Sequence, residues 1–284
     1  MKSSGRYDNV FPSIQFKYDL TKRWLTRLSY SNGIGRPDFG SIIPQLSANY
    51  ETEVLTRTNP GLLPQYVDNF DYTVEYYFKG AGVVSAGVFL KEVSDFIYQD
   101  QSDFVGFGQN NGYDGMYEGF NVVTSKNGGS ARYRGFELNY SQQLTFLPGF
   151  WRGFSVGANY TQLETKGNYG GTVATTEVAG FLPKTGNMMV NYRNSRWDIR
   201  VLVNWRDTYL VGVASSAARL RYQAPRTTVN LKTRYTLSSA FQLFCDVDNI
   251  FSELASERYW GVPERAGETQ TTVPKIVAGI QGRF

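Results

Sequence analysis

The stretch NFDYTVEYYFKG, residues 69–80, alternates between apolar and polar side chains. One face would carry Phe70, Tyr72, Val74, Tyr76 and Phe78, and the other Asp71, Thr73, Glu75, Tyr77 and Lys79. Because successive side chains of a β-strand point to opposite faces, this pattern predicts a strand between an apolar and a polar medium.

Two further stretches repeat the pattern. Residues 197–205, WDIRVLVNW, begin and end on tryptophan. A strand of this length, tilted by about 40°, rises roughly 23 Å, close to the ~25 Å apolar band of a bacterial outer membrane. The chain ends in PKIVAGIQGRF, residues 274–284, which alternates as well and closes on an aromatic residue. We interpret Phe284 as an assembly signal and interfacial anchor of an outer-membrane barrel.

Composition narrows the possible functions. The 284 residues include 29 Gly, 20 Tyr and 19 Phe but only 10 Pro, which favours strands and turns. The longest nearly apolar run, residues 83–90, is far shorter than the ~18 residues of a membrane helix. The net charge of +4 is scattered, so we expect no nucleic-acid partner. Histidine is absent, Cys245 is the single cysteine, and catalytic motifs are missing, so we expect neither an enzyme nor a cofactor or metal site.

Alternation and turn residues together predict eleven strands. They lie near residues 10–20, 24–34, 69–79, 83–98, 132–144, 153–164, 184–193, 196–212, 225–236, 240–251 and 274–284. The connections between them alternate between short turns and long loops. Outer-membrane barrels show this alternation, with short periplasmic turns and longer extracellular loops. We therefore expect residues 36–68, 99–131 and 254–272 to face the outside of the cell.

The same register predicts the lipid-facing positions. None is charged, as required where a mid-bilayer Arg or Lys costs about 2–4 kcal/mol. Besides the apolar positions already given, they are Ile14, Phe16, Tyr18, Trp24, Leu28, Tyr30, Val84, Ala86, Val88, Leu90, Phe136, Leu138, Tyr140, Phe154, Val156, Ala158, Tyr160, Met188, Val190, Tyr192, Val229, Leu231, Tyr235, Phe241, Leu243 and Val247. The expected fold is an antiparallel transmembrane β-barrel.

An odd strand count is unusual, because single-chain bacterial barrels have an even number of strands. We therefore expect this chain to form part of a larger barrel. Two alternatives remain open. A strand hidden within residues 99–131, such as FNVVTS at 120–125, would make the count even and fit a self-contained channel or structural barrel. A soluble β-sandwich that binds carbohydrate would also hide one face of each strand.

Six segments, taken in order, resemble the C-terminal half of the β-barrel of TonB-dependent outer-membrane receptors. They are SYSNGIGRPDFGSIIP at 29–44, NPGLLPQYVDNFDYTVEYYF at 59–78, VVSAGVFLKEVSDFI at 83–97, ARYRGFELNYSQQL at 131–144, DVDNIF at 246–251 and the terminal aromatic. The resemblance implies a barrel of about 22 strands, closed by an N-terminal plug, of which eleven would be half. Residues 1–284 would be the C-terminal part of this barrel, without the plug, the TonB-contacting segment, the signal peptide and the N-terminal strands.

The resemblance also implies a function and a location. Such receptors lie in the outer membrane of Gram-negative bacteria and take up scarce ligands with energy passed through the TonB protein. The implied partners are the lipid bilayer, the N-terminal barrel half, the plug, TonB and a small ligand. We expect a ferric siderophore or an oligosaccharide, with a slight preference for sugar because the loops carry Tyr and Trp.

Candidate residues fall into two groups. Inward positions would form a polar wall that holds the plug and guides solute: Glu75, Glu137, Arg200, Arg206 and Arg234, with Lys17, Arg27, Lys232 and Asp246. Loop positions that combine aromatic faces and polar groups would contact ligand. These are Arg36, Asp38, Arg57, Tyr113, Tyr117, Arg258, Tyr259 and Trp260, with Tyr50 and Tyr169.

Overall fold

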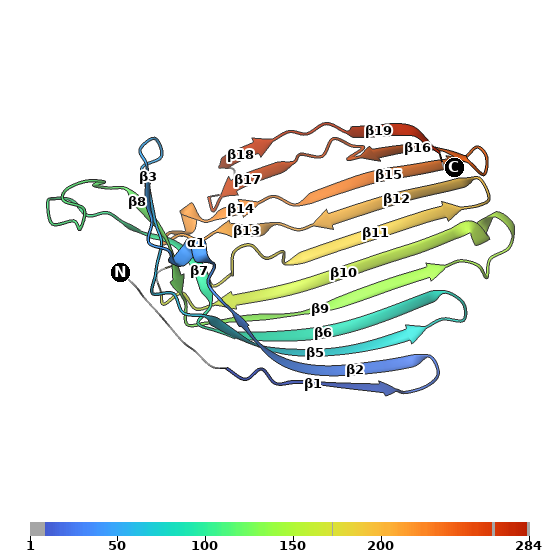
Figure 1. The fold of residues 1–284 in the computed structure, drawn as a ribbon, viewed down its shortest axis with the longest axis horizontal. Coiled ribbons are helices and arrows are strands. Elements are labelled where there is room, and N and C mark those ends of the chain that lie inside the picture. Colours follow the sequence, from blue (N-terminus) through green and yellow to red (C-terminus); the bar gives the residue numbers. More distant parts are fainter. Residues whose placement is uncertain (1–8, 172, 263–264, 283–284) are drawn as a thin grey trace.

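The computed structural model describes residues 9–171, 173–262 and 265–282, and its main element is an antiparallel sheet of eleven strands (Figure 1). In order across the sheet, the strands are β1 Ser13–Asp19, β2 Trp24–Gly35, β5 Gln65–Tyr77, β6 Gly82–Ser94, β9 Ser130–Gln143, β10 Phe154–Gly167, β11 Lys184–Arg193, β12 Trp197–Arg206, β15 Arg226–Thr236, β16 Phe241–Asp248 and β19 Lys275–Gly282. Within the described residues, β1 and β19 each pair on one side only, so the sheet is open. The predicted all-β class and the count of eleven are confirmed.

Three predicted strands extended well beyond the observed C-terminal ends. The strand expected at 83–98 ends at Ser94, because Asp95 adopts a φ of 54°, a left-handed conformation that does not continue a strand. The strand expected at 240–251 ends at Asp248 for the same reason, with Asn249 at a φ of 55°. The strand expected at 196–212 ends at Arg206, and residues 209–212 pair in another sheet.

The connections alternate in length as predicted. Short turns occupy 20–23, 78–81, 144–153, 194–196 and 237–240, and long connections occupy 36–64, 95–129, 168–183, 207–225 and 249–274. In Figure 1 the short turns gather at one end of the sheet and the long connections at the other. Thr21, Asn194 and Ser238 each accept backbone N–H bonds from the residues two and three positions later, at 2.8–3.2 Å. These side chains fix three of the short turns.

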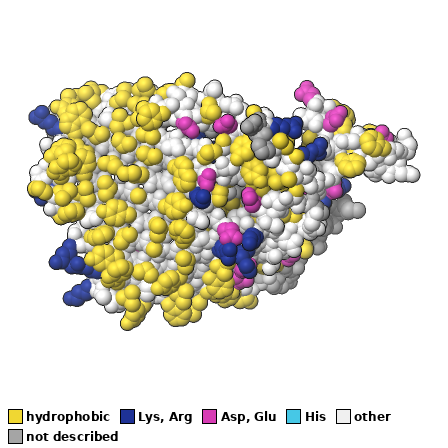
Figure 2. Space-filling view, turned by 180° about the vertical axis from the view of Figure 1, so that it is seen from behind, with side chains coloured by type: hydrophobic (Ala, Val, Ile, Leu, Met, Phe, Trp, Pro, Cys, Tyr) yellow, Lys and Arg dark blue, Asp and Glu magenta, His cyan; other side chains and the backbone are white. Residues whose placement is uncertain are grey.

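The outer face of the sheet is apolar and uncovered. Directly opposed residues share a face, and one continuous row runs through Phe16, Leu28, Tyr72, Val88 and Phe136. Phe16, Leu28 and Val88 are 60%, 52% and 55% exposed. Every position predicted to face lipid that belongs to a paired strand lies on this face by register. Figure 2 shows apolar side chains spread over it.

Aromatic side chains lie near both borders of this apolar surface, and charged side chains lie beyond its border at the loop end. Trp24 and Tyr76, with ring centroids 4.8 Å apart, lie near the short turns, and Tyr160 and Trp205 stack toward the loop end. Charged side chains appear on the outer face beyond that level, where they form pairs. Arg132 Nε lies 2.6 Å from Glu92 Oε1, and Arg134 Nη2 lies 2.7 Å from Glu164 Oε2. On the outer face, the apolar and the charged side chains therefore occupy separate segments of the strands.

The long connections form two small sheets that the sequence did not predict. One contains β3 Leu46–Asn49, β4 Val54–Arg57, β8 Asn121–Asn127 and β7 Ile97–Phe104. The other contains β13 Tyr209–Gly212, β14 Arg221–Gln223, β17 Ser256–Trp260 and β18 Ala266–Gln270. Strand β8 overlaps FNVVTS at 120–125, but it pairs with β4 and β7 and leaves the main sheet at eleven strands.

The connections also bury side chains of their own. A loop core contains Phe96, Tyr169, Val178, Leu210 and Leu220, and a tip core contains Leu55, Val105, Phe120 and Val122. Short helices complete the connections: α1 Phe39–Ile42, η1 Gly149–Gly153 and η2 Ala217–Arg219. Among the described residues, none of the helices is long and apolar enough to cross a membrane. Phe284 lies outside the described residues, so its assembly role stays a prediction.

Candidate functional site in the inner wall

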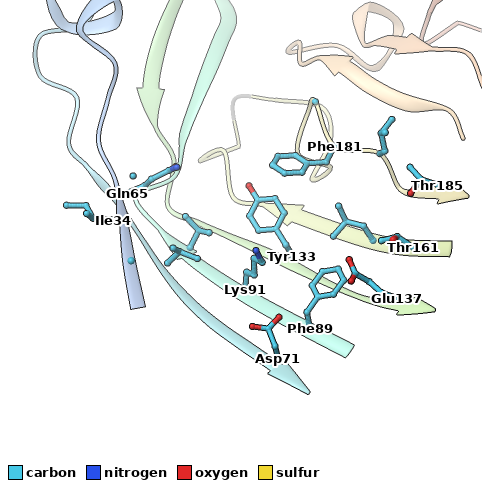
Figure 3. Close-up of a pocket in the computed structure, with 17 residues that line it drawn as sticks. Ile34, Gln65, Asp71, Phe89, Lys91, Tyr133, Glu137, Thr161, Phe181 and Thr185 are labelled. Atoms are coloured by element: carbon cyan, nitrogen blue, oxygen red, sulfur yellow. The ribbon is translucent and has the colours of Figure 1, made fainter. Parts of the chain in front are cut away.

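The inner face of the sheet, opposite the apolar outer face, holds a hollow of about 790 Å³, which we call the wall pocket. Residues from β2, β5, β6, β9, β10 and β11 line it, together with the connection at 180–182. It lies toward the loop end of the sheet (Figure 3). A hollow lined by six adjacent strands and one loop is a typical position for a ligand site.

The lining combines aromatic rings and charges. Asp71 is directly opposite Phe89, and Lys91 is directly opposite Tyr133. Glu137 lies further along β9, and Figure 3 shows its carboxylate beside the Phe89 ring. None of Asp71, Lys91 and Glu137 makes an ion pair within the described residues. The pocket therefore offers two carboxylates and one ammonium group beside aromatic faces.

Gly135 leaves space on β9 for the Phe89 ring. A Cβ at this position would lie 2.0 Å from the carbonyl oxygen of Gln162 and 2.8 Å from Cζ of Phe89. Any larger residue would push the Phe89 ring away from β9, since a contact below 3.0 Å cannot be accommodated without movement. The glycine therefore allows the Phe89 ring to lie across the strand.

The connection at 168–183 forms the roof of the pocket. Leu163 N donates to the carbonyl of Pro183 at 2.7 Å, and Gly167 N donates to that of Thr176 at 2.6 Å. Gly180, at a φ of 87°, donates to the carbonyl of Leu210 at 2.8 Å. This turn brings Phe181 next to Tyr133, with ring centroids 4.7 Å apart.

Tyr169 anchors this roof from within the loop core. Its side chain is 5% exposed, and its hydroxyl donates to the carbonyl of Glu177 at 2.7 Å. Burial raises the pKa of the Tyr169 phenol to about 12. Tyr169 therefore supports the roof, and its predicted contact with ligand stays a prediction.

The other loop candidates lie in three separate groups. Asp38 accepts from Ser41 N and Oγ at 2.9 and 2.7 Å, which caps α1 and lowers the pKa of Asp38. Arg36 precedes it along the chain. Tyr50, Tyr113 and Tyr117 surround the tip core, with Arg57 at the end of β4.

Arg258, Tyr259 and Trp260 belong to β17 in the second small sheet. Arg258 Nη1 lies 2.8 Å from Glu268 Oε2, Tyr259 stacks on Tyr222, and Trp260 lies under Arg265. The structure does not bring these three together with the other candidates, and each side chain already has a partner in the fold.

The inner-wall candidates all lie on the inner face by register. Glu75 pairs with Arg27 at 3.0 Å, Arg200 Nε donates to Asn191 Oδ1 at 3.4 Å, and Arg234 is directly opposite Asp198. Glu137 lines the wall pocket, and Arg206 lines a second hollow beside it. Their role in holding a plug or guiding solute stays a prediction.

Sequence reasoning missed Phe89, Lys91, Tyr133 and Phe181 as site residues. Alternation carries the first three to the inner face together with Asp71 and Glu137, so part of the signal was present. Phe181 is brought in by the folded connection, which no local pattern reveals. In the described part of the chain, no group of Cys, Asp or Glu side chains is arranged to hold a metal ion.

Comparison with known proteins matches residues 2–250 to a family described as TonB dependent receptor-like, beta-barrel. Comparison with curated proteins gives no match. In fold the chain is similar to the ferric enterobactin receptor PfeA of Pseudomonas aeruginosa, with a TM-score of 0.70 and 18% identity over 97% of this chain and 40% of that one.

Two other solved structures give the same result. The copper transporter OprC has a TM-score of 0.66 and 15% identity over 96% of this chain and 39% of that one. The FrpB iron transporter from Neisseria meningitidis has a TM-score of 0.59 and 12% identity over 97% of this chain and 38% of that one. At these identities the likeness concerns the fold, and this chain spans about two fifths of the length of the proteins it matches.

Proposed function

Because the chain belongs to the family of TonB-dependent receptor β-barrels, we propose that it forms part of an outer-membrane receptor for TonB-energised uptake of a scarce ligand. Members of this family are receptors and transporters, not enzymes. The ligand would be an oligosaccharide or a ferric siderophore. The observation that carries the proposal is the combination of an uncovered apolar outer face with an inner face that holds a polar and aromatic pocket.

The outer face favours a membrane over the two alternative functions. In a soluble sandwich, a second layer would cover Phe16, Leu28 and Val88, which are at least half exposed. A self-contained channel would need a closed sheet, whereas β1 and β19 have free edges within the described residues. Each unsatisfied backbone group in hydrocarbon costs several kcal/mol, so these edges need partner strands.

The directions of β1 and β19 determine the number and the direction of the partner strands. β1 leads into a short turn, and β19 follows a long connection, so both edges run toward the short-turn end. A second copy in the same orientation would meet these edges in parallel. We therefore propose that residues 1–284 are the C-terminal part of the barrel. An odd number of N-terminal strands, with both end strands running outward, would complete it around a plug.

Uptake is the direct test of function. The complete protein would be expressed in cells with and without TonB and given ferric siderophores under iron limitation, or oligosaccharides as sole carbon source. We expect one ligand class to support growth only with TonB. Phe181→Ala should reduce that growth, whereas Phe107→Ala, at a loop position that is 75% exposed and not part of the pocket lining, should not. Growth independent of TonB would contradict the proposal.

Membrane topology can be tested separately. In a Cys245→Ala background, cysteines at Ser47, Asn111 and Thr269 should react with an impermeant maleimide on intact cells, since these positions lie in long connections. Cysteines at Gly80 and Ser195, in short turns, should react only after the outer membrane is permeabilised. The reverse pattern would invert the proposed orientation.

A further inference from the structure

A second hollow of about 380 Å³ adjoins the wall pocket and shares Leu182 and Thr185 with it. Its polar lining consists of donors and neutral groups: Thr185, Asn187, Asn204, Arg206, Arg226 and Thr228. No carboxylate lines it. We call it the arginine hollow. The hollow therefore contains two positively charged guanidinium groups and no negatively charged group to balance them.

The two arginines face each other across the sheet. Arg206 on β12 and Arg226 on β15 are directly opposite in register, and both are half-buried. Like charges in directly opposed positions destabilise a sheet. Within the described residues, neither guanidinium takes part in an ion pair.

Two other basic sites on β12 and β15 each have a carboxylate directly opposite in register. Arg200 and Lys232 are also directly opposite each other, but Asp246 faces Lys232 from the next strand. Arg234 is opposite Asp198, whose carboxylate pairs with Arg193 at 2.9 Å. Among these sites, the Arg206–Arg226 pair alone has no carboxylate directly opposite either member.

An unpaired hydrogen-bond donor also indicates that the hollow lacks an acceptor. Nε of Arg226 is buried and has no hydrogen-bond partner in the described part of the chain. A buried donor that is left unpaired is costly, so the Arg226 guanidinium would gain from an acceptor that enters the hollow. The Arg206 guanidinium lies 5.3 Å from the centre of the Tyr209 ring, a contact that helps to orient it.

We propose that the arginine hollow binds an oxyanion, the carboxylate or phosphate group of the transported ligand. The planar guanidinium fork matches both groups and can bind either with two parallel hydrogen bonds. The hydroxyls of Thr185 and Thr228 supply neutral donors beside it. This assignment rests on the proposed receptor function and narrows its ligand to one with an anionic group.

The row of residues across the inner wall also sets the shape of that ligand. Glu137, Thr161, Thr185 and Arg206 follow one another on four adjacent strands. At about 4.8 Å per strand, Glu137 and Arg206 stand roughly 14 Å apart. The anionic group would lie at the arginines, and a neutral, hydroxyl-bearing or aromatic body would extend into the wall pocket, away from its two carboxylates.

The test uses the complete protein in detergent and isothermal titration with inorganic phosphate and, separately, acetate. Ionic strength is held constant with sodium chloride, because anion binding to arginine is screened by salt. We expect saturable binding of at least one anion, and the stronger binder identifies the group. Arg206→Gln and Arg226→Gln should each weaken it about tenfold, the effect of losing one charge-assisted hydrogen bond.

Matched variants keep the result interpretable. Arg226→Lys retains the charge without the fork and should lose less affinity than Arg226→Gln. Arg196→Gln, in the short turn at the other end of β12, should leave affinity unchanged. Heat-modifiable gel mobility would verify that every variant is folded.

Three outcomes would overturn the assignment: no anion binding by the folded wild type, equal loss in Arg196→Gln, or unchanged affinity in both arginine variants. If the wild type binds no anion and Arg226→Gln lowers its thermal stability, a carboxylate elsewhere in the protein already occupies the hollow, and the assignment is also wrong. Anion binding combined with uptake independent of TonB would instead reject the proposed function and leave the subsite in place.

Discussion

In the eleven-stranded sheet, large apolar side chains such as Phe16, Leu28 and Val88 lie on the outside, whereas in the long connections Leu55, Phe96 and Leu210 are buried. Within the described residues, few apolar side chains of the sheet are buried: Leu25 is one, and Val93 and Ala131 pack in the loop core. The outer face of the sheet gains stability only from an apolar solvent, while its inner face is polar. The connections instead bury cores as a water-soluble protein does. Substitutions should therefore have opposite effects in the two regions.

The largest effect is expected in the loop core. Phe96 is 1% exposed and contacts the rings of Tyr98 and Tyr169 at 5.5 and 5.3 Å. Phe96→Ala should destabilise the loop region by about 3–5 kcal/mol through the cavity it creates. Limited proteolysis of the complete protein should show faster cleavage in residues 95–129, with unchanged heat-modifiable mobility of the sheet. Phe107→Ala is the control, and equal cleavage of both variants would show that the loop core does not organise these connections.

The second prediction tests the two faces of the sheet with one substitution at neighbouring positions. Val201 is opposite Val190 and Leu231 on the outer face, and Leu202 is opposite Met189 and Asn230 on the inner face. Val201→Arg should cost about 2–4 kcal/mol in a bilayer, and Leu202→Arg should be tolerated. The folded fraction after refolding into lipid vesicles, read from gel mobility, measures the difference. Equal damage would invalidate the register of β12.

The third prediction uses pH to separate the regions. Asp100 on β7 is 1% exposed. Burial alone would raise the pKa of its carboxyl group, but hydrogen bonds from Lys126 and Ser102 outweigh burial, so the net pKa is lowered. A lowered folded pKa adds stability above the unfolded value of about 3.9, and this stability is lost as pH falls through the folded pKa. Exchange protection of β7 and β8 amides should therefore fall below about pH 4, before that of the main sheet. Asp100→Asn should flatten this pH dependence, and an unchanged profile would contradict it.

These differences also explain what could be predicted from sequence. In the sheet, one face is apolar and uncovered and the other forms the polar inner wall, so alternation in Phe70–Tyr76 or Trp197–Trp205 reports the structure directly. β6 and β16 end just before Asp95 and Asn249, single left-handed residues whose effect alternation does not reveal. The wall pocket depends on how residues 168–183 fold back onto Tyr133, and this follows from packing among distant connections. Hence the wall was predictable, and the site was only partly so.

The smallest effect is expected for a turn motif that occurs in both regions, an asparagine side chain that accepts two backbone hydrogen bonds. Asn194 Oδ1 accepts from Arg196 N and Trp197 N in a short turn, and Asn111 Oδ1 accepts from Tyr113 N and Gly115 N in a long connection. Replacing either by Ala removes these two bonds and a third that its Nδ2 donates, a loss of about 1–3 kcal/mol, toward the lower end of the usual net value for each. Asn194→Ala should slow sheet assembly, measured as folding into vesicles, because the turn joins β11 to β12. Asn111→Ala should leave assembly unchanged and raise only local amide exchange near residues 111–116, since that segment lies beyond every strand of the main sheet. A slower assembly in both variants would mean that the connections and the sheet fold as one unit.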